Sequence, residues 1–358
     1  MVIPVRAVPG GVTHTGGAVQ SERDSRRPSA IGGVAGSQLR LLTKVARMYH
    51  EHGIRQPQIA EQLHISQPRV SRLLKQAVEL GIVRTSVVTP AGVHAELEEQ
   101  IQRRYGLRDV VVADVDTDTA SPQEQSLLRA IGSAAAVYLE TTLTGGDRIG
   151  ISSWSSTVLA TVDTMRPRPT PVAQQVVQMI GGVGNSRSQV YATRLADRLA
   201  LLTGAEAVFL PAPGLAASAA ARDALLADPH ISAVFATYHN LTMVLAGVGS
   251  LEPSPLLVES GNAIADADQS DLRRLGAVGD ICLRFFDEHG NLVPSALDER
   301  VLGIDADTLR SIPRVVALAG GSRKYTAIRA ALLGGWIDVL ITDLDVARRL
   351  AAEPAPAD

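Results

Sequence analysis

A hydroxyl-rich loop between an expected strand and an expected helix is the first segment whose residue types could do chemistry. The segment Gly150–Thr157 reads GISSWSST, a strand that runs into a turn and then into a helix. Ser155, Ser156 and Thr157 would lie at the helix N-terminus, where free N–H groups and the helix dipole favour an anion. The alternative is an ordinary Ser/Thr N-cap, which needs no ligand. The loop therefore predicts either a phosphate-binding position or a simple cap.

A lysine marks a second loop. The chain contains only three Lys, and Lys324 is the only one beyond residue 75. It ends the segment Gly320–Lys324, GGSRK, which follows the apolar run Val315–Ala319. An ammonium is a compact point charge, whereas the guanidinium that this chain otherwise uses is a planar fork. We therefore expect Lys324 to bind an anionic ligand; the alternative is codon drift with no functional meaning.

Two further stretches have the composition of binding loops. In GDICLRFFDEHG, residues Gly279–Gly290, Asp280 and Arg284 are four apart in an expected strand and hence on the same side of it. They would contact a ligand or form a structural ion pair. Gly181–Gly184, GGVG, follows another expected strand. Because it does not satisfy GxGxxG, it indicates a tight turn or a close ligand approach and not a dinucleotide site.

Residues 56–83, QPQIAEQLHISQPRVSRLLKQAVELGIV, have the spacing of a helix-turn-helix. One helix is expected from Pro57 to Leu63 and another after the N-cap Ser66, and the β-branched run Ile82–Thr89 predicts a strand that would form a wing. In such modules the N-terminal half of the last helix enters the major groove of DNA. The outward residues expected to bind DNA are Gln67, Pro68, Arg69, Ser71, Arg72 and Lys75.

The charge distribution supports a DNA-binding role for this segment. Arg and Gln pair with base edges, whereas Ser71 and Lys75 are better suited to phosphates. Residues 38–89 hold eight Lys and Arg against three Glu, a net charge of +5, whereas residues 90–358 carry a net charge of −10. This asymmetry favours a polyanionic partner for the first segment alone. The alternative is a small helical bundle with a solvated basic face.

The rest of the chain alternates short apolar runs with helical periods, which predicts an α/β fold with an open, mainly parallel sheet. The expected strands are Asp109–Ala113, Arg148–Ser152, Val176–Ile180, Ala207–Leu210, Ala233–Thr237, Met243–Val248, Ile281–Phe286, Val315–Ala319 and Val339–Thr342. Helices are expected at Leu127–Thr142, Gln189–Leu202 and Thr326–Leu333, among others.

Together these motifs resemble the SorC family (SorC/DeoR type) of bacterial transcriptional regulators, from about Leu41 to Leu350. The resemblance rests on the helix-turn-helix, GISSWSST, AGVGSL, VGDICLRFFDEHGN and AGGSRKYTAIRAALLGGWIDVLITD. It implies a winged helix-turn-helix and a larger Rossmann-like domain similar to glucosamine-6-phosphate deaminase and ribose-5-phosphate isomerase. It also implies tetramers that sense phosphorylated sugars or related metabolites. Ser155–Thr157 match the family's phosphate loop, Asp280 an acidic ligand to sugar hydroxyls, and Lys324 a phosphate-binding lysine.

Two departures from the family pattern change the expected effector. The family's usual Gly-Arg-Thr is here Ser155–Ser156–Thr157, and Ile180 stands where some sugar-bisphosphate sensors have Arg. Two missing cations favour a monophosphate, or an unphosphorylated sugar or polyol, over a bisphosphate. The residues expected to bind the effector are Ser155, Ser156, Thr157, Gly182, Gln189, Asp280, Arg284 and Lys324.

Composition excludes several classes of protein. Apolar residues make up 46% of the chain, enough for a core, and no run approaches the ~18 apolar residues of a membrane span. One cysteine, Cys282, excludes a disulfide framework and a Cys-rich metal site. The first residues lack a secretion signal, so we expect a cytoplasmic protein.

The expected domains are a disordered tail (1–36), the winged helix-turn-helix (37–90) and an effector and oligomerisation domain (91–358).

The sequence therefore predicts a one-component regulator of a carbohydrate-catabolism operon that binds double-stranded operator DNA and a sugar-type effector. It is expected to form a homodimer or homotetramer, and to use no metal, cofactor or membrane. The alternative is a sugar-phosphate isomerase or deaminase with a DNA-binding appendage. That chemistry needs a placed acid–base pair, and beside Asp280 no second partner stands out.

Overall fold

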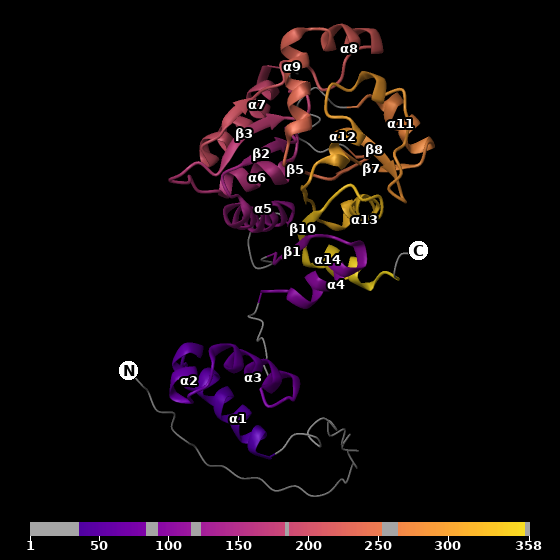
Figure 1. Cartoon of the computed structure of the whole chain (residues 1–358). Helices are drawn as coiled ribbons and strands as arrows, with labels where there is room; N and C mark the ends of the chain where they lie inside the picture. Colours follow the sequence, from indigo (N-terminus) through magenta and orange to yellow (C-terminus); the bar gives the residue numbers. More distant parts are fainter. Residues whose placement is uncertain (1–35, 84–91, 116–122, 183–185, 253–263, 355–358) are drawn as a thin grey trace, which may run out of the picture. The chain divides into compact units, whose positions relative to one another are not determined.

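The computed structural model describes residues 36–83, 92–115, 123–182, 186–252 and 264–354 (Figure 1). The chain divides into two compact units, Met1–Val88 and Thr89–Asp358, which are considered separately below. The predicted tail and most of the predicted wing strand lie outside the described residues. Among those described, no helix is long and apolar enough to cross a membrane.

Three helices form the described part of the first unit: α1 (Gly36–His50), α2 (Gln56–Gln62) and α3 (Gln67–Glu79). Their apolar positions recur every three or four residues and close a small core, with Leu42, Val45, Ile59, Val70 and Ala77 fully buried. Pro57 lies in the first turn of α2, as predicted, where a missing N–H costs nothing. Ser66 takes the N-cap position of α3, but its side chain makes no capping hydrogen bond.

A seven-stranded parallel sheet forms the centre of the second unit, in the order β1-β10-β9-β5-β2-β3-β4. Its strands are β1 (Asp109–Ala113), β2 (Asp147–Ile151), β3 (Ala173–Gln178), β4 (Glu206–Val208), β5 (Met243–Ala246), β9 (Val315–Leu318) and β10 (Val339–Asp343). The helices are α4 (Ala95–Tyr105), α5 (Gln123–Thr142), α6 (Ser156–Thr164), α7 (Ser186–Thr203), α8 (Ala219–Leu226), α9 (Pro229–Thr237), α11 (Asp266–Arg274), α12 (Ala306–Ser311), α13 (Tyr325–Leu333) and α14 (Leu344–Ala352). The predicted α/β class is confirmed.

Both faces of the sheet are buried, which explains the near-continuous apolar runs of its strands. Successive residues point to opposite faces, so Val316 and Leu318 of β9 join one core and Val315 and Ala317 the other. The first core includes residues of α5, α6 and α7, and the second includes residues of α4, α13 and α14. The sheet is therefore covered by helices on both faces, as Figure 1 shows.

Two predicted strands were wrong. Ala233–Thr237 is the second half of α9, because Asp228 caps this helix and Pro229 occupies its first position. Ile281–Phe286 is not one strand but the turn of a hairpin in a second, antiparallel sheet, β6-β7-β8. Its strands are β6 (Gly249–Ser250), β7 (Ala277–Ile281) and β8 (Arg284–Asp287). The turn is made by Cys282 and Leu283, whose positive φ angles of 56° and 61° are rare for residues other than glycine.

Candidate functional site

The winding of the sheet changes direction between β2 and β5. From β2 the chain adds β3 and β4 on one side, then returns to place β5 on the other side of β2. In open α/β sheets, ligands bind beyond the carboxyl ends of the strands at such a switch point. A cavity of about 640 Å³, including the open space at its mouth, lies there. Its lining residues include Ser152, Trp154, Ser155, Ser156, Gly247, Gly249, Glu252, Asp280, Cys282, Leu283, Arg323 and Lys324.

The hydroxyl-rich loop does lie at the start of a helix, but most of its hydroxyls are already used. Thr157 donates to the carbonyl oxygen of Leu318 (2.8 Å), so in its 2.8 Å contact with Ser155 it must accept. Ser155 therefore donates to Thr157 and accepts the N–H of Val158 (3.3 Å), which makes it the N-cap of α6. The ordinary-cap alternative thus holds for Ser155, and the Thr157 hydroxyl is occupied by Leu318 and Ser155. Ser156 and the first N–H groups of α6 remain for a ligand.

Lys324 reaches the same cavity from the loop after β9. Its ammonium has no hydrogen bond or ion pair to any residue in the described part of the chain. Burial and the neighbouring Arg323 lower the pKa of Lys324, and Asp280 and Glu124 oppose this shift. Arg323 itself is held 3.7 Å from Glu252 at the cavity rim. Lys324 is therefore the cation available to an anionic ligand.

Asp280 faces the cavity from β7. Its carboxylate accepts the N–H of Leu283 (3.0 Å) and so braces the left-handed turn of the hairpin. Gly249 lies opposite on β6, and a Cβ there would overlap the carboxylate, so any larger residue would force the Asp280 side chain to shift. Burial raises the pKa of Asp280 to about 6, against the opposing effects of the Leu283 N–H and Lys324. The fold therefore brings Asp280 and Lys324, 44 residues apart, to one cavity.

The raised pKa of Asp280 predicts a pH dependence of stability. Its ordinary pKa is 3.8, so the folded state binds more protons than the unfolded state between about pH 4 and 6. The free energy of unfolding should fall as pH rises through this window and level off above it. Partial exposure limits the effect to about 1–2 kcal/mol. Urea unfolding from pH 4 to 7 tests this. The free energy of unfolding should decrease less with pH in Asp280→Asn than in the wild type, and the same pH dependence in both proteins would contradict the prediction.

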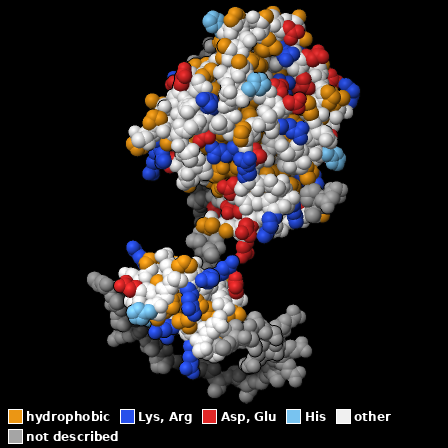
Figure 2. Space-filling view, in the orientation of Figure 1, with side chains coloured by type: hydrophobic (Ala, Val, Ile, Leu, Met, Phe, Trp, Pro, Cys, Tyr) orange, Lys and Arg blue, Asp and Glu red, His pale blue; other side chains and the backbone are white. Residues whose placement is uncertain are grey.

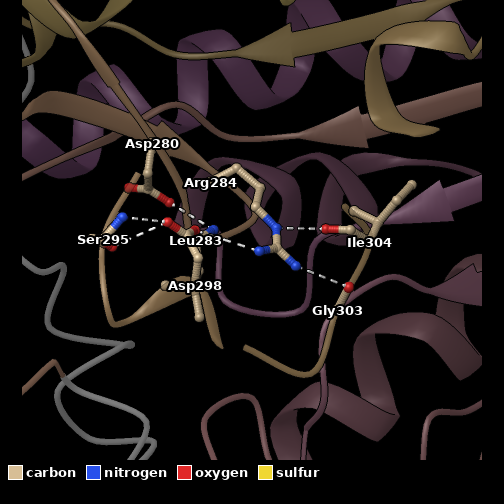
Figure 3. A network of polar contacts seen from close by, with 7 residues as sticks. All are labelled: Asp280, Leu283, Arg284, Ser295, Asp298, Gly303 and Ile304. Carbon is tan, nitrogen blue, oxygen red and sulfur yellow. Dashed lines mark hydrogen bonds and ion pairs between the residues drawn. The ribbon is translucent and has the colours of Figure 1, made fainter. Parts of the chain in front are cut away.

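Arg284 does not line the cavity, contrary to the expectation that it shares a side with Asp280. The turn between β7 and β8 separates them, and Figure 3 shows the Arg284 guanidinium directed at other partners. It donates to the carbonyl oxygens of Ile304 (2.9 Å) and Gly303 (3.3 Å) and lies 3.4 Å from Asp298. Arg284 is buried, and burial lowers its pKa. Its contacts are those of a structural residue.

The glycine loop contributes less than expected. Gly182 is buried but is not among the residues lining the cavity, and Val183 and Gly184 lie outside the described residues. Gln189 lies on α7, where its side chain is not described. The structure therefore groups Ser155, Ser156, Asp280 and Lys324 at the cavity, with Thr157 directly behind.

Several cavity residues carry little signal in the sequence. Cys282 and Leu283 look like ordinary strand residues, and only the hairpin turn between β7 and β8 shows that they form a wall of the cavity. Burial raises the pKa of Cys282 to about 12, so its thiol stays neutral. Trp154 is buried at the cavity edge, 3.4 Å from the carbonyl oxygen of Gly181. Among the described residues, no cluster of His, Cys, Asp and Glu could hold a metal ion.

A separate candidate site lies on α3 of the first unit. The residues predicted to bind DNA, Gln67, Pro68, Arg69, Ser71, Arg72 and Lys75, are all exposed. The opposite face of α3 is buried against α1 and α2, so these six side chains share the outward face. Figure 2 shows Lys and Arg side chains spread over the surface of this unit. The arrangement matches a helix presented to a polyanion.

Comparisons with known proteins identify the family to which the chain belongs. Residues 90–352 match the Sugar-bind family model, described as "Putative sugar-binding domain". The deoxyribonucleoside regulator of Bacillus subtilis (strain 168) is 33% identical over 310 residues, 87% of this chain and 96% of that protein. The sorbitol operon regulator of Klebsiella pneumoniae is 31% identical over 316 residues, 87% of this chain and 98% of that protein.

Solved structures extend the likeness to the fold. The full-length sorbitol operon regulator SorC from Klebsiella pneumoniae superposes with a TM-score of 0.65 at 29% identity, covering 88% of this chain and 99% of that one. The sugar-binding domain of a DeoR regulator from Pseudomonas syringae pv. tomato has a TM-score of 0.57 at 42% identity, covering 72% of this chain and 99% of that one. The chain therefore belongs to the SorC family of transcriptional regulators, and its residues 90–352 are the sugar-binding domain of that family.

Proposed function

We propose that this regulator controls a carbohydrate-catabolism operon, with α3 binding operator DNA and the cavity between β2 and β5 binding a sugar-type effector. The observation that carries the proposal is the meeting of Lys324 and Asp280 at the topological switch point. The relatives are named as transcriptional regulators, so the chain is a regulator rather than a sugar-phosphate isomerase or deaminase.

The effector class follows from the charges at the cavity. One ammonium without an ion-pair partner among the described residues suits a single phosphate, while the carboxylate of Asp280 can accept from sugar hydroxyls. Arg323 lies at the exposed rim, 3.7 Å from Glu252, so its charge is partly balanced there, whereas Lys324 is the more buried cation. A sugar or polyol monophosphate fits best, and an unphosphorylated polyol is the second candidate. Relatives named for a sorbitol operon and for erythritol catabolism support this class.

A thermal-shift screen tests this assignment. A ligand that binds only the folded state raises the melting temperature, by an amount that grows with its concentration relative to Kd. Sugars, polyols and their monophosphates should include at least one stabilising compound, and Lys324→Met should reduce the shift that a sugar or polyol monophosphate produces. Stabilisation by sugar bisphosphates alone would contradict the proposed class.

Arg69 and Arg72 are the two residues of α3 best suited to base contacts. Replacing either by Ala should weaken operator binding by about 1–3 kcal/mol, the range for a bidentate base contact. Titration of a DNA fragment from the promoter region at one fixed salt concentration measures this. Lys75→Ala, by contrast, should weaken binding equally across sequences and reduce its salt dependence. Unchanged operator affinity in both arginine variants would remove α3 from the DNA interface.

Assembly and location are part of the same proposal. A small DNA-binding module gains specificity from two half-sites spaced by a dimer. We therefore propose a homodimer or homotetramer held together by the second unit, in the cytoplasm where the operator lies. Light scattering of residues 90–358 tests the assembly, and a monomer at micromolar concentration would place the interface elsewhere.

A further inference from the structure

The cavity loop is fixed at its beginning to the N-terminus of the last helix, α14. In Gly320–Lys324, the N–H of Gly321 donates to Oδ2 of Asp343 (2.7 Å). The other carboxylate oxygen of Asp343 caps α14, because it accepts the N–H groups of Asp345 (3.0 Å) and Val346 (3.1 Å). One buried carboxylate thus connects the loop to the start of the helix.

The same loop is fixed at its end to the other end of α14. Tyr325 directly follows Lys324, and its hydroxyl donates to Oε1 of Glu353 (2.6 Å), the residue after the helix. The guanidinium of Arg349 lies 3.6 Å from the centre of the Tyr325 ring. Burial and the bond to Glu353 raise the pKa of Tyr325 to about 12, so it remains a donor at neutral pH. Arg329 holds Glu353 from its other side at 3.2 Å.

Helix α14 is in turn hydrogen-bonded to α4, the first described helix of this unit. The last carbonyl groups of a helix lack intrahelical partners, and here two of them are taken by α4. Arg104 donates to the carbonyl oxygen of Leu350 (2.9 Å), and Gln100 donates to that of Ala351 (3.0 Å). Ile101, between them on α4, is fully buried. The two helices contact each other and lie side by side in Figure 1. Along the chain, α4 is the first described helix after the DNA-binding unit.

We infer that α14 is the coupling element of this regulator: it transmits the state of the cavity loop to α4, the helix that follows the DNA-binding unit along the chain. The inference rests on the proposed effector role of the cavity. A ligand that contacts Lys324 displaces or fixes a loop joined to both ends of α14, and α4 is held by the carbonyl groups at one of those ends. Tyr325 is thus a positioning residue that contacts α14 and need not touch the ligand.

Amide hydrogen exchange of the full chain without ligand tests the connection directly. In Tyr325→Phe, which keeps the ring under Arg349 and deletes the hydroxyl, residues 95–105 should exchange roughly two- to tenfold faster, the equivalent of one lost hydrogen bond. Tyr138→Phe on α5 is the matched control and should leave α4 unchanged. Glu353→Gln retains an acceptor for the Tyr325 hydroxyl, so the exchange of residues 95–105 in this variant should stay closer to that of the wild type. Faster exchange confined to residues 320–333 and 344–353 would overturn the inference.

A second measurement adds glucose 6-phosphate or sorbitol to the same proteins. In the wild type, a ligand that protects residues 320–324 should also change the exchange of residues 95–105. In Tyr325→Phe the loop should still be protected, with ligand affinity within about twofold, while α4 no longer responds. An α4 response as large in the variant as in the wild type would also overturn the inference. If neither compound protects the wild-type loop, neither is the effector, and the ligand-free measurement still decides the role of α14.

Discussion

Replacing Arg284 by Met is expected to lower the free energy of unfolding by about 3–5 kcal/mol, the range for breaking a buried ion pair from one side. The methionine keeps most of the side-chain volume but leaves Asp298 without its cation and the carbonyl oxygens of Gly303 and Ile304 without a donor. Figure 3 shows that this one guanidinium connects β8 to the segment around residue 303 and to Asp298. The network therefore determines how the hairpin that bears Asp280 is held.

Urea unfolding followed by tryptophan fluorescence measures this change. The signal reports on the second unit, which contains Arg284, because both tryptophans, Trp154 and Trp336, lie in that unit. Arg274→Met is the matched control, since Arg274 forms an exposed pair with Asp271 and should contribute less than about 1 kcal/mol. Equal loss of stability in the two variants would show that the Arg284 network is not structural. If Arg284→Met is fully folded and still binds the effector more weakly than the wild type, Arg284 contacts the ligand after all.

The parallel strands are predicted well from the sequence, because strands that are buried on both faces consist of nearly continuous apolar residues. Asp109–Ala113 matches β1 residue for residue, and the runs at Val315–Ala319 and Val339–Thr342 differ from β9 and β10 by one residue at an end. The two errors have local physical causes. An Asp-Pro helix start precedes Ala233–Thr237, and two residues other than glycine adopt left-handed backbone inside Ile281–Phe286. Apolar periodicity alone reveals neither feature.

The cavity could be predicted only in part. Lys324 stands out because lysine is so rare in this chain, and Asp280 stands out because a carboxylate lies among apolar residues. The use of the Thr157 hydroxyl could not be predicted, since its acceptor is the carbonyl oxygen of Leu318, 161 residues away. The separation of Arg284 from Asp280 likewise depends on the hairpin turn. Residue types indicate the chemistry, whereas the pairing of donors with acceptors requires the fold.

Replacing Lys324 by Met should weaken binding of a phosphorylated effector by about 1.5–3 kcal/mol, roughly 10- to 150-fold in Kd, the range for hydrogen bonds to charged groups. Methionine keeps much of the length of the side chain and deletes the ammonium, which has no ion-pair partner in the described part of the chain. Its removal breaks no ion pair or hydrogen bond among the described residues, so stability should change little. Isothermal titration calorimetry with a compound identified by thermal shift measures the difference.

Comparison with Asp280→Ala then determines the class of effector. If the effector carries a phosphate, Lys324→Met should cost more than Asp280→Ala, because the ammonium and the first N–H groups of α6 bind the anion together. If the effector is an uncharged polyol, the order should reverse, because its hydroxyls donate to the carboxylate and gain little from a cation. Operator affinity without effector should be the same in both variants and the wild type. If neither substitution alters binding of a confirmed effector, the effector does not bind in the cavity between β2 and β5.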